Sequence, residues 1–248
     1  MKSPLATAAL NKGDNFLHYS KLELAATDAD QHAHNLTNWQ QQYDQMSAGN
    51  FYGQLIELQF DGLQCFQEHT SQALRQSCCT WDQSLWLGIP VNENQSSKIN
   101  GMHIEKNHIM CRPGTQQFEL ITPNDFDIYG LVVKQETIEK MAENQNVSIN
   151  WTHLYQQGRL TLPQKTITAL RFVLNNLLAD KNHQQRPAKL QYDVIMMALL
   201  ESLENSQPVK KSAISFLHRQ HIVEQAKEYL RLHQDSAVSI NDLCTLCH

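Results

Sequence analysis

The sequence predicts an α+β chain in which a β-rich part, residues 1–133, precedes a helical part, residues 134–208. From about residue 50 to residue 133, short apolar segments alternate with polar residues and are separated by turn signals, the pattern of a small barrel or jelly roll. From Lys134 onward, apolar residues recur at helical spacing instead. The composition, 41% hydrophobic and 18% charged, is that of an ordinary globular protein, and the net charge of -5 argues against a chain that coats nucleic acid along its length.

An N-terminal helix is expected before the first of these strands. Leu36, Trp39, Tyr43 and Met46 follow one another at spacings of 3, 4 and 3 residues, which places them on one helical face. Gly49 would end this helix, because glycine is favoured just past a helix C-terminus.

The first predicted strand alternates apolar and polar residues, with Ile56, Leu58 and Phe60 against Glu57 and Gln59. This alternation is typical of a half-buried strand, whose polar residues face water. Asp61-Gly62 is a favoured hairpin turn, so the chain from Leu63 onward is expected to return as the neighbouring strand.

Further strands follow at short intervals. The stretch SLWLGIPV, residues 84–91, is apolar on both faces and predicts a buried strand. Asn100-Gly101 marks a second hairpin, and two more short strands flank the turn-rich residues Thr122–Asp125.

Three helices are predicted in the second part of the chain. Residues 135–145 form the first, and the second begins at Pro163 with an apolar stripe at Ile167, Leu170, Leu174 and Leu177. The third, residues 188–206, carries a stripe at Leu190, Val194, Met197 and Leu200 or Glu201, and Ile195, Leu199 and Leu203 widen it. A face of this width is expected to be buried on more than one side, against the barrel, another helix or a second subunit. Residues 206–213 are polar and are the best linker candidate.

The last segment contains two helical signals. Ile222, Ala226, Tyr229 and Leu230 share one helical face, and Ser239 with Asp242 forms a capping box that starts a new helix at Ile240. The last five residues of the sequence, 244–248, read C-x-x-C-H, which is also the attachment pattern of a c-type haem. No secretion signal and no apolar stretch of membrane-spanning length is seen, so a haem protein is disfavoured. The six cysteines are interpreted as reduced thiols; they are Cys65, Cys78, Cys79, Cys111, Cys244 and Cys247.

Three stretches, residues 36–53, 73–90 and 112–133, resemble the sensor half of AraC/XylS-family regulators of ethanolamine operons. The tail resembles the opening of that family's DNA-binding domain, in which a long helix leads into a short one. Ser239, Ile240, Asp242 and Leu243 match the short helix. The sequence given ends before the recognition helix of that domain, so the resemblance implies a regulator that is truncated within its helix-turn-helix.

The resemblance implies a domain plan and a set of partners. Residues 1–133 would be a cupin-like β-barrel that senses an effector and carries an N-terminal helix, and residues 134–208 a helical linker and dimerisation region. Residues 209–248 would be a partial, all-α helix-turn-helix domain. The family members are cytoplasmic and act as homodimers with promoter DNA and RNA polymerase. Their effectors here would be ethanolamine and adenosylcobalamin, with no covalently bound cofactor and no membrane partner.

A small cation such as ethanolammonium needs a carboxylate and, preferably, an aromatic face. Trp81, Trp86, Asp82 and Glu119 supply these groups, while His103 and Arg112 could fix an oxygen atom. The alternatives are plain structural roles: Trp86 lies in an apolar strand and suits the core, and Glu119 would simply point to water.

The alternative functions are a cupin-type metal-binding enzyme and a small-molecule-binding protein that does not bind DNA. His32 and His34 have the H-x-H spacing of a metal pair, but they precede the predicted helix without a helpful acidic residue, so a solvated segment is favoured. Cys78-Cys79 suits a buried strand better than a reactive thiol. No hydrolase triad, phosphate loop or H-E-x-x-H motif is present, so no catalytic or metal site is assigned and no enzyme activity is expected.

Overall fold

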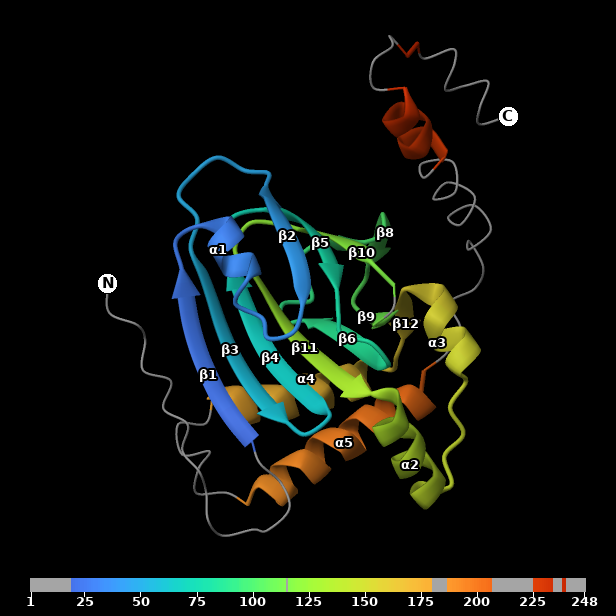
Figure 1. Cartoon of the computed structure of the whole chain (residues 1–248). Coiled ribbons are helices and arrows are strands. Elements are labelled where there is room, and N and C mark those ends of the chain that lie inside the picture. Colours follow the sequence, from blue (N-terminus) through green and yellow to red (C-terminus); the bar gives the residue numbers. More distant parts are fainter. Residues whose placement is uncertain (1–18, 115, 180–186, 207–224, 234–237, 240–248) are drawn as a thin grey trace. The chain divides into compact units, whose positions relative to one another are not determined.

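The computed structural model describes residues 19–114, 116–179, 187–206, 225–233 and 238–239. The chain divides into two compact units, Met1–Pro208 and Val209–His248. Two antiparallel sheets and a layer of helices make up the described part of the first unit (Figure 1). In the second unit, residues 225–232 are helical, as predicted. No helix of the described residues is long and apolar enough to cross a membrane.

The large sheet has seven strands, and each neighbouring pair is antiparallel. Its strands lie in the order β1 (Tyr19–Ala26), β3 (Gly53–Phe60), β4 (Leu63–Thr70), β11 (Phe126–Lys134), β6 (Ser84–Pro90), β9 (His108–Pro113) and β12 (Arg159–Thr161). The small sheet has five, in the order β2 (Gln40–Gln45), β5 (Leu74–Cys79), β10 (Phe118–Thr122), β7 (Ser97–Ile99) and β8 (Met102–Ile104).

The predicted barrel is not closed. The described strands form two open sheets, and no ladder joins β1 or β12 of the large sheet to β2 or β8 of the small one. The chain passes between sheets at its turns: β10 pairs with β5 and β7, whereas β11, which follows at once, pairs with β4 and β6. Asp125, with φ of 56°, turns the chain at this passage. The two open sheets form a sandwich, which agrees with the jelly-roll alternative of the prediction and not with the barrel.

The helix predicted for residues 36–46 is wrong. Residues Gln40–Gln45 are β2, which pairs with β5 along its whole length. Asn38, with φ of 63°, lies in the left-handed region and interrupts any helix starting at Leu36. Met46, expected on the buried face, is 59% exposed. The 3- and 4-residue spacing of the apolar residues is therefore coincidental, and hydrogen bonding to β5 makes this segment a strand.

Both hairpin predictions are confirmed. Asp61-Gly62 joins β3 to β4, and Asn100-Gly101 joins β7 to β8. Gly62, Asn100 and Gly101 all have positive φ values, of 74°, 47° and 76°, which is why glycine and asparagine are favoured there. The apolar stretch around β6 is also buried along its whole length, as expected.

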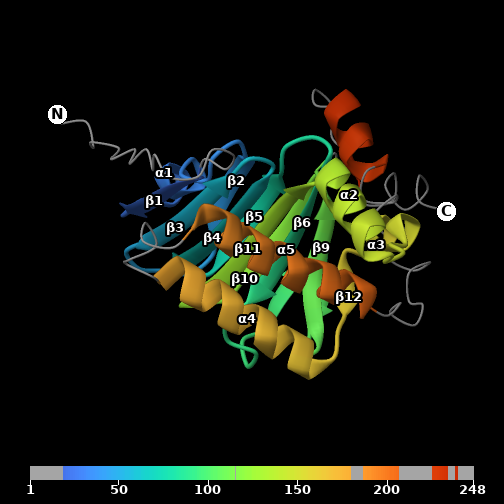
Figure 2. The same cartoon turned by 90° about the horizontal axis from the view of Figure 1, so that it is seen from below.

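Helices cover one face of the large sheet (Figure 2). They are α2 (Gln135–Gln145), α3 (Trp151–Gln157), α4 (Gln164–Ala179) and α5 (Ala188–Glu204), while the short α1 (Ala29–Ala33) lies beside β2. The stripe predicted on α4 is confirmed, since Ile167, Leu170, Leu174 and Leu177 are all buried. These side chains pack with the outer face of the sheet into one apolar core.

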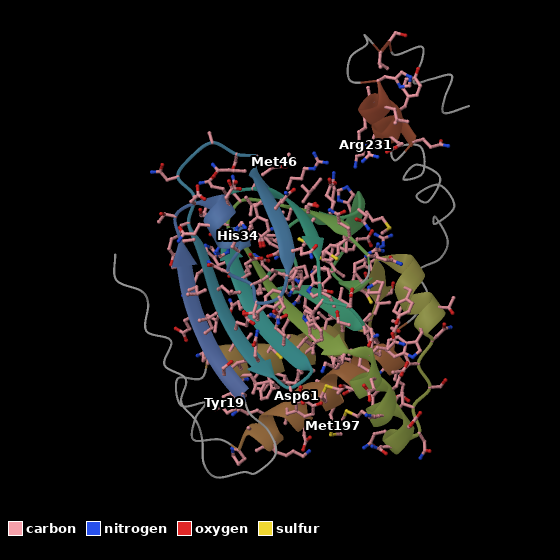
Figure 3. The ribbon with its side chains drawn as sticks, in the orientation of Figure 1. Tyr19, His34, Met46, Asp61, Met197 and Arg231 are labelled. Carbon is pink, nitrogen blue, oxygen red and sulfur yellow. The ribbon has the colours of Figure 1, made fainter. Side chains whose placement is uncertain are left out.

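α5 has two apolar faces, one buried against the sheet and one exposed. Ile195, Leu199 and Leu203, the residues expected to widen the stripe, are buried in the core. Most of the stripe itself is exposed. Leu190, Val194 and Met197 point away from the sheet, and Figure 3 labels Met197 at this outer side, whereas Leu200 is buried. Within the described residues nothing covers this second face.

Candidate functional site

The face of the large sheet that looks toward the small sheet is unusually polar for a buried surface. It alternates along each strand with the helix-facing residues, so it was expected to meet water. The small sheet covers it instead, and several polar side chains are buried there, among them Glu57, Gln64, Glu68, Thr70 and Arg112. Such groups are costly to bury unless they find partners, so each marks a place where the sandwich interior is built for polar contact.

Glu57 is a buried carboxylate held by hydrogen bonds and by no cation. It is 1% exposed. Thr37 donates to Oε2 through its backbone N–H at 3.4 Å and its hydroxyl at 3.2 Å. The side-chain amides of Gln59 and Gln64 donate to Oε1 at 2.5 and 2.8 Å. Glu57 accepts in all four bonds, and no described residue forms an ion pair with it.

Two tryptophans converge on the same network. Gln64 Oε1 accepts from Trp39 Nε1 at 2.9 Å and from Trp81 Nε1 at 3.4 Å. Both indoles are half-buried, so they lie where the interior meets solvent. An indole face beside a carboxylate that lacks a counter-charge attracts a small organic cation by charge and by the ring quadrupole. We call Thr37, Trp39, Glu57, Gln64 and Trp81 the Glu57 site.

An aromatic cluster forms the floor next to this site. Trp39 meets Trp86 edge-on, with ring centroids 5.9 Å apart, and Trp86 stacks on Phe118 at 4.6 Å. The Nε1 atom of Trp86 is buried and has no acceptor among the described residues. Gly88 lies under this indole: a Cβ there would lie 2.5 Å from Trp86 Cζ2, so only glycine lets the ring rest on the sheet.

A second polar group lies under α1. Tyr43 Oη donates to Glu68 Oε1 at 2.8 Å, and burial raises the pKa of the Tyr43 phenol. His32 Nε2 lies 3.1 Å from the same oxygen, in a direction that does not complete a hydrogen bond. The expectation of a solvated His32 is wrong, since the residue is 2% exposed and Gly53 leaves space for its ring. His34 is exposed and points elsewhere, so the H-x-H spacing does not converge on one point.

The six residues proposed as effector contacts separate into two groups. Trp81, Trp86 and Arg112 lie in or at the sandwich interior, and Trp86 and Arg112 are opposite each other on β6 and β9. Trp86 also packs in the core, as its alternative interpretation had it. The other three are not brought together with them. Asp82 and His103 are exposed, and Glu119 pairs with Arg75 at 2.6 Å on the outer side of the small sheet.

The most informative residues, Glu57, Gln64 and Trp39, were not among the predicted contacts. Glu57 and Gln64 are polar residues that alternate with apolar ones on the neighbouring strands β3 and β4. The sequence shows this alternation, but it does not show that a second sheet covers the polar residues. Of the predicted helix-turn-helix residues, Ile240, Asp242 and Leu243 lie outside the described residues, and Ser239 is exposed outside any helix.

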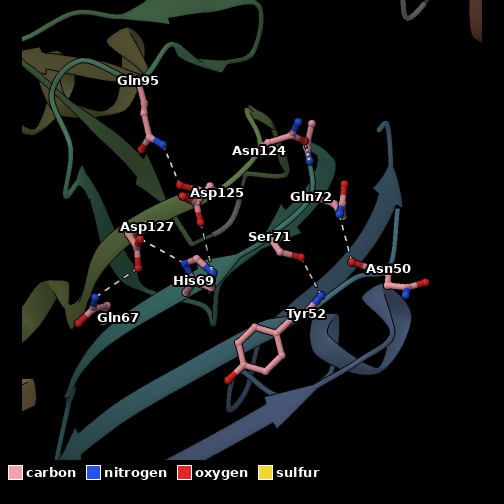
Figure 4. Close-up of polar contacts among 11 residues, drawn as sticks. Asn50, Tyr52, Gln67, His69, Ser71, Gln72, Gln95, Asn124, Asp125 and Asp127 are labelled. Carbon is pink, nitrogen blue, oxygen red and sulfur yellow. Dashed lines mark hydrogen bonds and ion pairs between the residues drawn. The ribbon is translucent and has the colours of Figure 1, made fainter. Parts of the chain in front are cut away.

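Away from the Glu57 site, a polar network ties the turns at one end of the large sheet (Figure 4). His69 on β4 lies 3.2 Å from Asp127 and 3.8 Å from Asp125, and Tyr52 packs against its ring. Gln95 donates to the Asp125 carbonyl. No group of three metal-binding side chains occurs in the part of the chain that the structure describes. We interpret the network as fixing the β10–β11 passage.

A cavity of about 170 Å³ lies between the α2–α3 loop and the end of α5, lined by Ser148, Ile149, Asn150, Leu154, Leu203, Glu204 and Ser206. Its lining mixes apolar and polar side chains and contains a single charged group, Glu204. It offers no aromatic face and no pair of opposed charges, so it is a weaker candidate than the sandwich interior.

No family model matches the sequence. Among solved structures, the AraC-like transcriptional activator CuxR is similar with a TM-score of 0.51 and 10% identity, over 92% of this chain and 84% of that one. ToxT from Vibrio cholerae O395 gives a TM-score of 0.31 with 11% identity, over 85% of this chain and 69% of that one. Oxalate decarboxylase from Bacillus subtilis gives 0.24 with 11% identity, over 43% of this chain and 35% of that one. The first similarity shows that the chain has the fold of an AraC-like activator.

Proposed function

We propose that this chain is the sensor part of an AraC/XylS-type transcription regulator, and that its effector is a small organic cation bound at the Glu57 site. The fold shared with an AraC-like activator supports the class. The single observation that carries the ligand assignment is Glu57, a buried carboxylate with four hydrogen-bond donors and no cationic partner among the described residues.

Ethanolammonium fits the chemistry of this site. Its ammonium would replace the Gln59 amide, the one donor to Glu57 that comes from the half-buried end of the strand, and would lie against the Trp39 indole. Its hydroxyl would find the amide of Gln64. The resemblance that suggests ethanolamine also suggests adenosylcobalamin as a second effector, to which we assign no residues.

A titration with matched variants tests the assignment. Ethanolamine hydrochloride should raise the melting temperature of the chain, because a ligand that binds only the folded state stabilises it. Glu57→Gln should abolish the rise, while Glu119→Gln, which removes an exposed carboxylate of the same type, should keep it. An unchanged response in Glu57→Gln, or no response in the unaltered chain at saturating amine, would overturn the proposal. Adenosylcobalamin belongs in a parallel titration.

The AraC/XylS class also suggests three macromolecular partners: promoter DNA, RNA polymerase and a second copy of the chain. Residues 209–248 would open the part that binds promoter DNA, and the intact regulator would recruit RNA polymerase and activate ethanolamine utilisation genes. Homodimerisation would use the exposed stripe of α5, where Leu190, Val194 and Met197 are 55%, 41% and 59% exposed. Sedimentation tests the last point: Val194→Asp should shift a dimer to monomers, whereas Lys189→Asp on the same helix should not.

A further inference from the structure

Arg112 is a buried charge without a counter-charge. The residue is 7% exposed on β9, its Nε atom has no acceptor, and no hydrogen bond or ion pair joins its guanidinium to any described residue. Burial lowers the pKa of the guanidinium, although the group stays charged. An unpaired buried guanidinium is strongly unfavourable, so a site that keeps one has a use for its charge.

Arg159 brings a second guanidinium to the same face. β12 pairs with β9 so that Arg159 lies opposite Met110, two residues before Arg112. Opposed residues of neighbouring strands share a face, and so do residues two apart on one strand, so both arginines project toward the sandwich interior. Arg159 donates to the backbone carbonyl of His103, which is a neutral acceptor. Neither guanidinium is therefore neutralised by a described carboxylate.

The described side chains around the two arginines add no negative charge that reaches either guanidinium. Gly158 lies close to Arg112: a Cβ there would lie 3.7 Å from Arg112 Nη1 and 2.9 Å from Met102 Cε, so the guanidinium and the Met102 methyl group both pack near this glycine. His108, on the same face of β9, has its pKa lowered by burial and by the charge of Arg159. The acidic residue that acts on His108 is Glu105, which is exposed. Strands β8, β9 and β12 lie together at this end of the sandwich (Figure 1).

We propose that Arg112 and Arg159 form a receptor for an oxyanion, the carboxylate or phosphate group of a small molecule, at the β8–β9 edge of the sandwich. A guanidinium presents paired donors that match either group. The receptor is separate from the Glu57 site. Glu57 on β3 and Arg112 on β9 are four strand spacings apart in the large sheet, which places their backbones about 19 Å apart at about 4.8 Å for each spacing. The two charged groups are therefore taken as separate centres for different ligands, although Trp39 of the Glu57 site contacts Trp86, the cross-strand neighbour of Arg112.

The melting temperature of the whole chain tests the proposal, with inorganic phosphate and acetate as probes against chloride at equal ionic strength. At least one probe should give a saturable rise, and the stronger of the two identifies the group. Arg112→Met should lose the rise yet be at least as stable as the unaltered chain without probe, because it removes an unpaired buried charge. Arg112→Lys should raise the half-effect concentration at least about tenfold, since the paired donors are lost. Arg75→Met, on a surface arginine, should respond normally.

Three results would overturn the receptor: equal melting temperatures in all three salts, a normal anion response in Arg112→Met, or a marked loss of stability in that variant without probe. The last would mean that the guanidinium has a structural partner. The Arg112→Met variant should still show the ethanolamine-induced rise in melting temperature, whether or not the unaltered chain binds an anion. This measurement therefore tests the Glu57 site independently of the anion receptor.

Discussion

On strand β11, Leu131 and Val133 face the helices, whereas Gly130 and Val132 face the small sheet. The same alternation on β3 and β4 places Leu58 opposite Cys65 on the helix side, and Glu57 opposite Phe66 on the sandwich side. The helix side is apolar where α4 and α5 pack on it, and its polar pair His69 and Asp127 lies at one end of the sheet. The sandwich side mixes aromatic rings with buried carboxylates, amides and a guanidinium.

The difference teaches how one sheet serves two purposes. Because successive side chains of a strand point to opposite faces, stability and recognition occupy alternate positions of the same segments. The helix side gains from close apolar packing and buries few polar groups, among them the Cys65 and Cys111 thiols. The sandwich side keeps polar groups whose hydrogen bonds are incomplete, as at Trp86 Nε1 and Arg112 Nε, and incomplete polar groups are what a ligand completes.

The largest effect should come from the helix side. Leu131→Ala removes a fully buried side chain from a packed core, so the free energy of unfolding should fall by about 2–5 kcal/mol in urea denaturation. Met46→Ala, at an exposed position, should change it by less than about 0.5 kcal/mol. If the two faces have separate roles, the folded Leu131→Ala protein keeps its ethanolamine response; loss of that response would break the comparison.

The glycines of the sandwich side give the next effect. A Cβ at Gly130 would lie 2.0 Å from Phe66 Cζ, so Gly130→Ala should overpack the interior and cost about 1–3 kcal/mol. Gly101→Ala meets no atom within 4 Å and should suffer only from its φ of 76°, about 1 kcal/mol. Near-ultraviolet circular dichroism should change in the first variant alone. Adding Phe66→Leu should recover part of the first loss and none of the second.

Buried thiols on both faces predict a weaker, pH-dependent effect. Burial raises the pKa of Cys65 and Cys78, and that of Cys111 to about 12. An unfolded thiol loses its proton near about pH 8.5, so the folded state holds these protons more tightly. This stabilisation is complete below that pH and is lost as the pH rises toward the folded value. Urea midpoints should therefore decline from about pH 8.5 upward, and Cys111→Ala should flatten the decline; equal slopes would contradict the assignment.

Several strands and both hairpins were readable because turns and alternation are local. Asp61-Gly62 and Asn100-Gly101 require positive φ, and the fully apolar β6 needs cover on both faces wherever it lies. The failure at β2 has the opposite cause. The sequence QQQYDQ has little intrinsic strand preference, and its pairing with β5 is a contact between segments about 35 residues apart in the chain.

The site was harder to predict than the fold for a related reason. Alternation on β3 correctly separates Glu57 from Leu58, but it does not say whether the polar side meets water or a second sheet. Residues chosen by chemical type alone, such as Glu119 and Asp82, therefore lie on the surface, whereas Glu57 was assigned to solvent although it is buried. Position in the tertiary structure, more than residue type, decides which carboxylate can attract a cation.

The smallest expected effect tests this last distinction. Glu119 and Arg75 form an ion pair at 2.6 Å, but their side chains are 35% and 53% exposed, so water screens the pair. A double-mutant cycle with Arg75→Ala and Glu119→Ala should give a coupling of about 0.2–1 kcal/mol that fades at high salt. The ethanolamine response should be the same in all four proteins of the cycle. A response that Glu119→Ala abolishes would move recognition to the outer side of the small sheet, and the contrast between the two faces would no longer explain where the ligand binds.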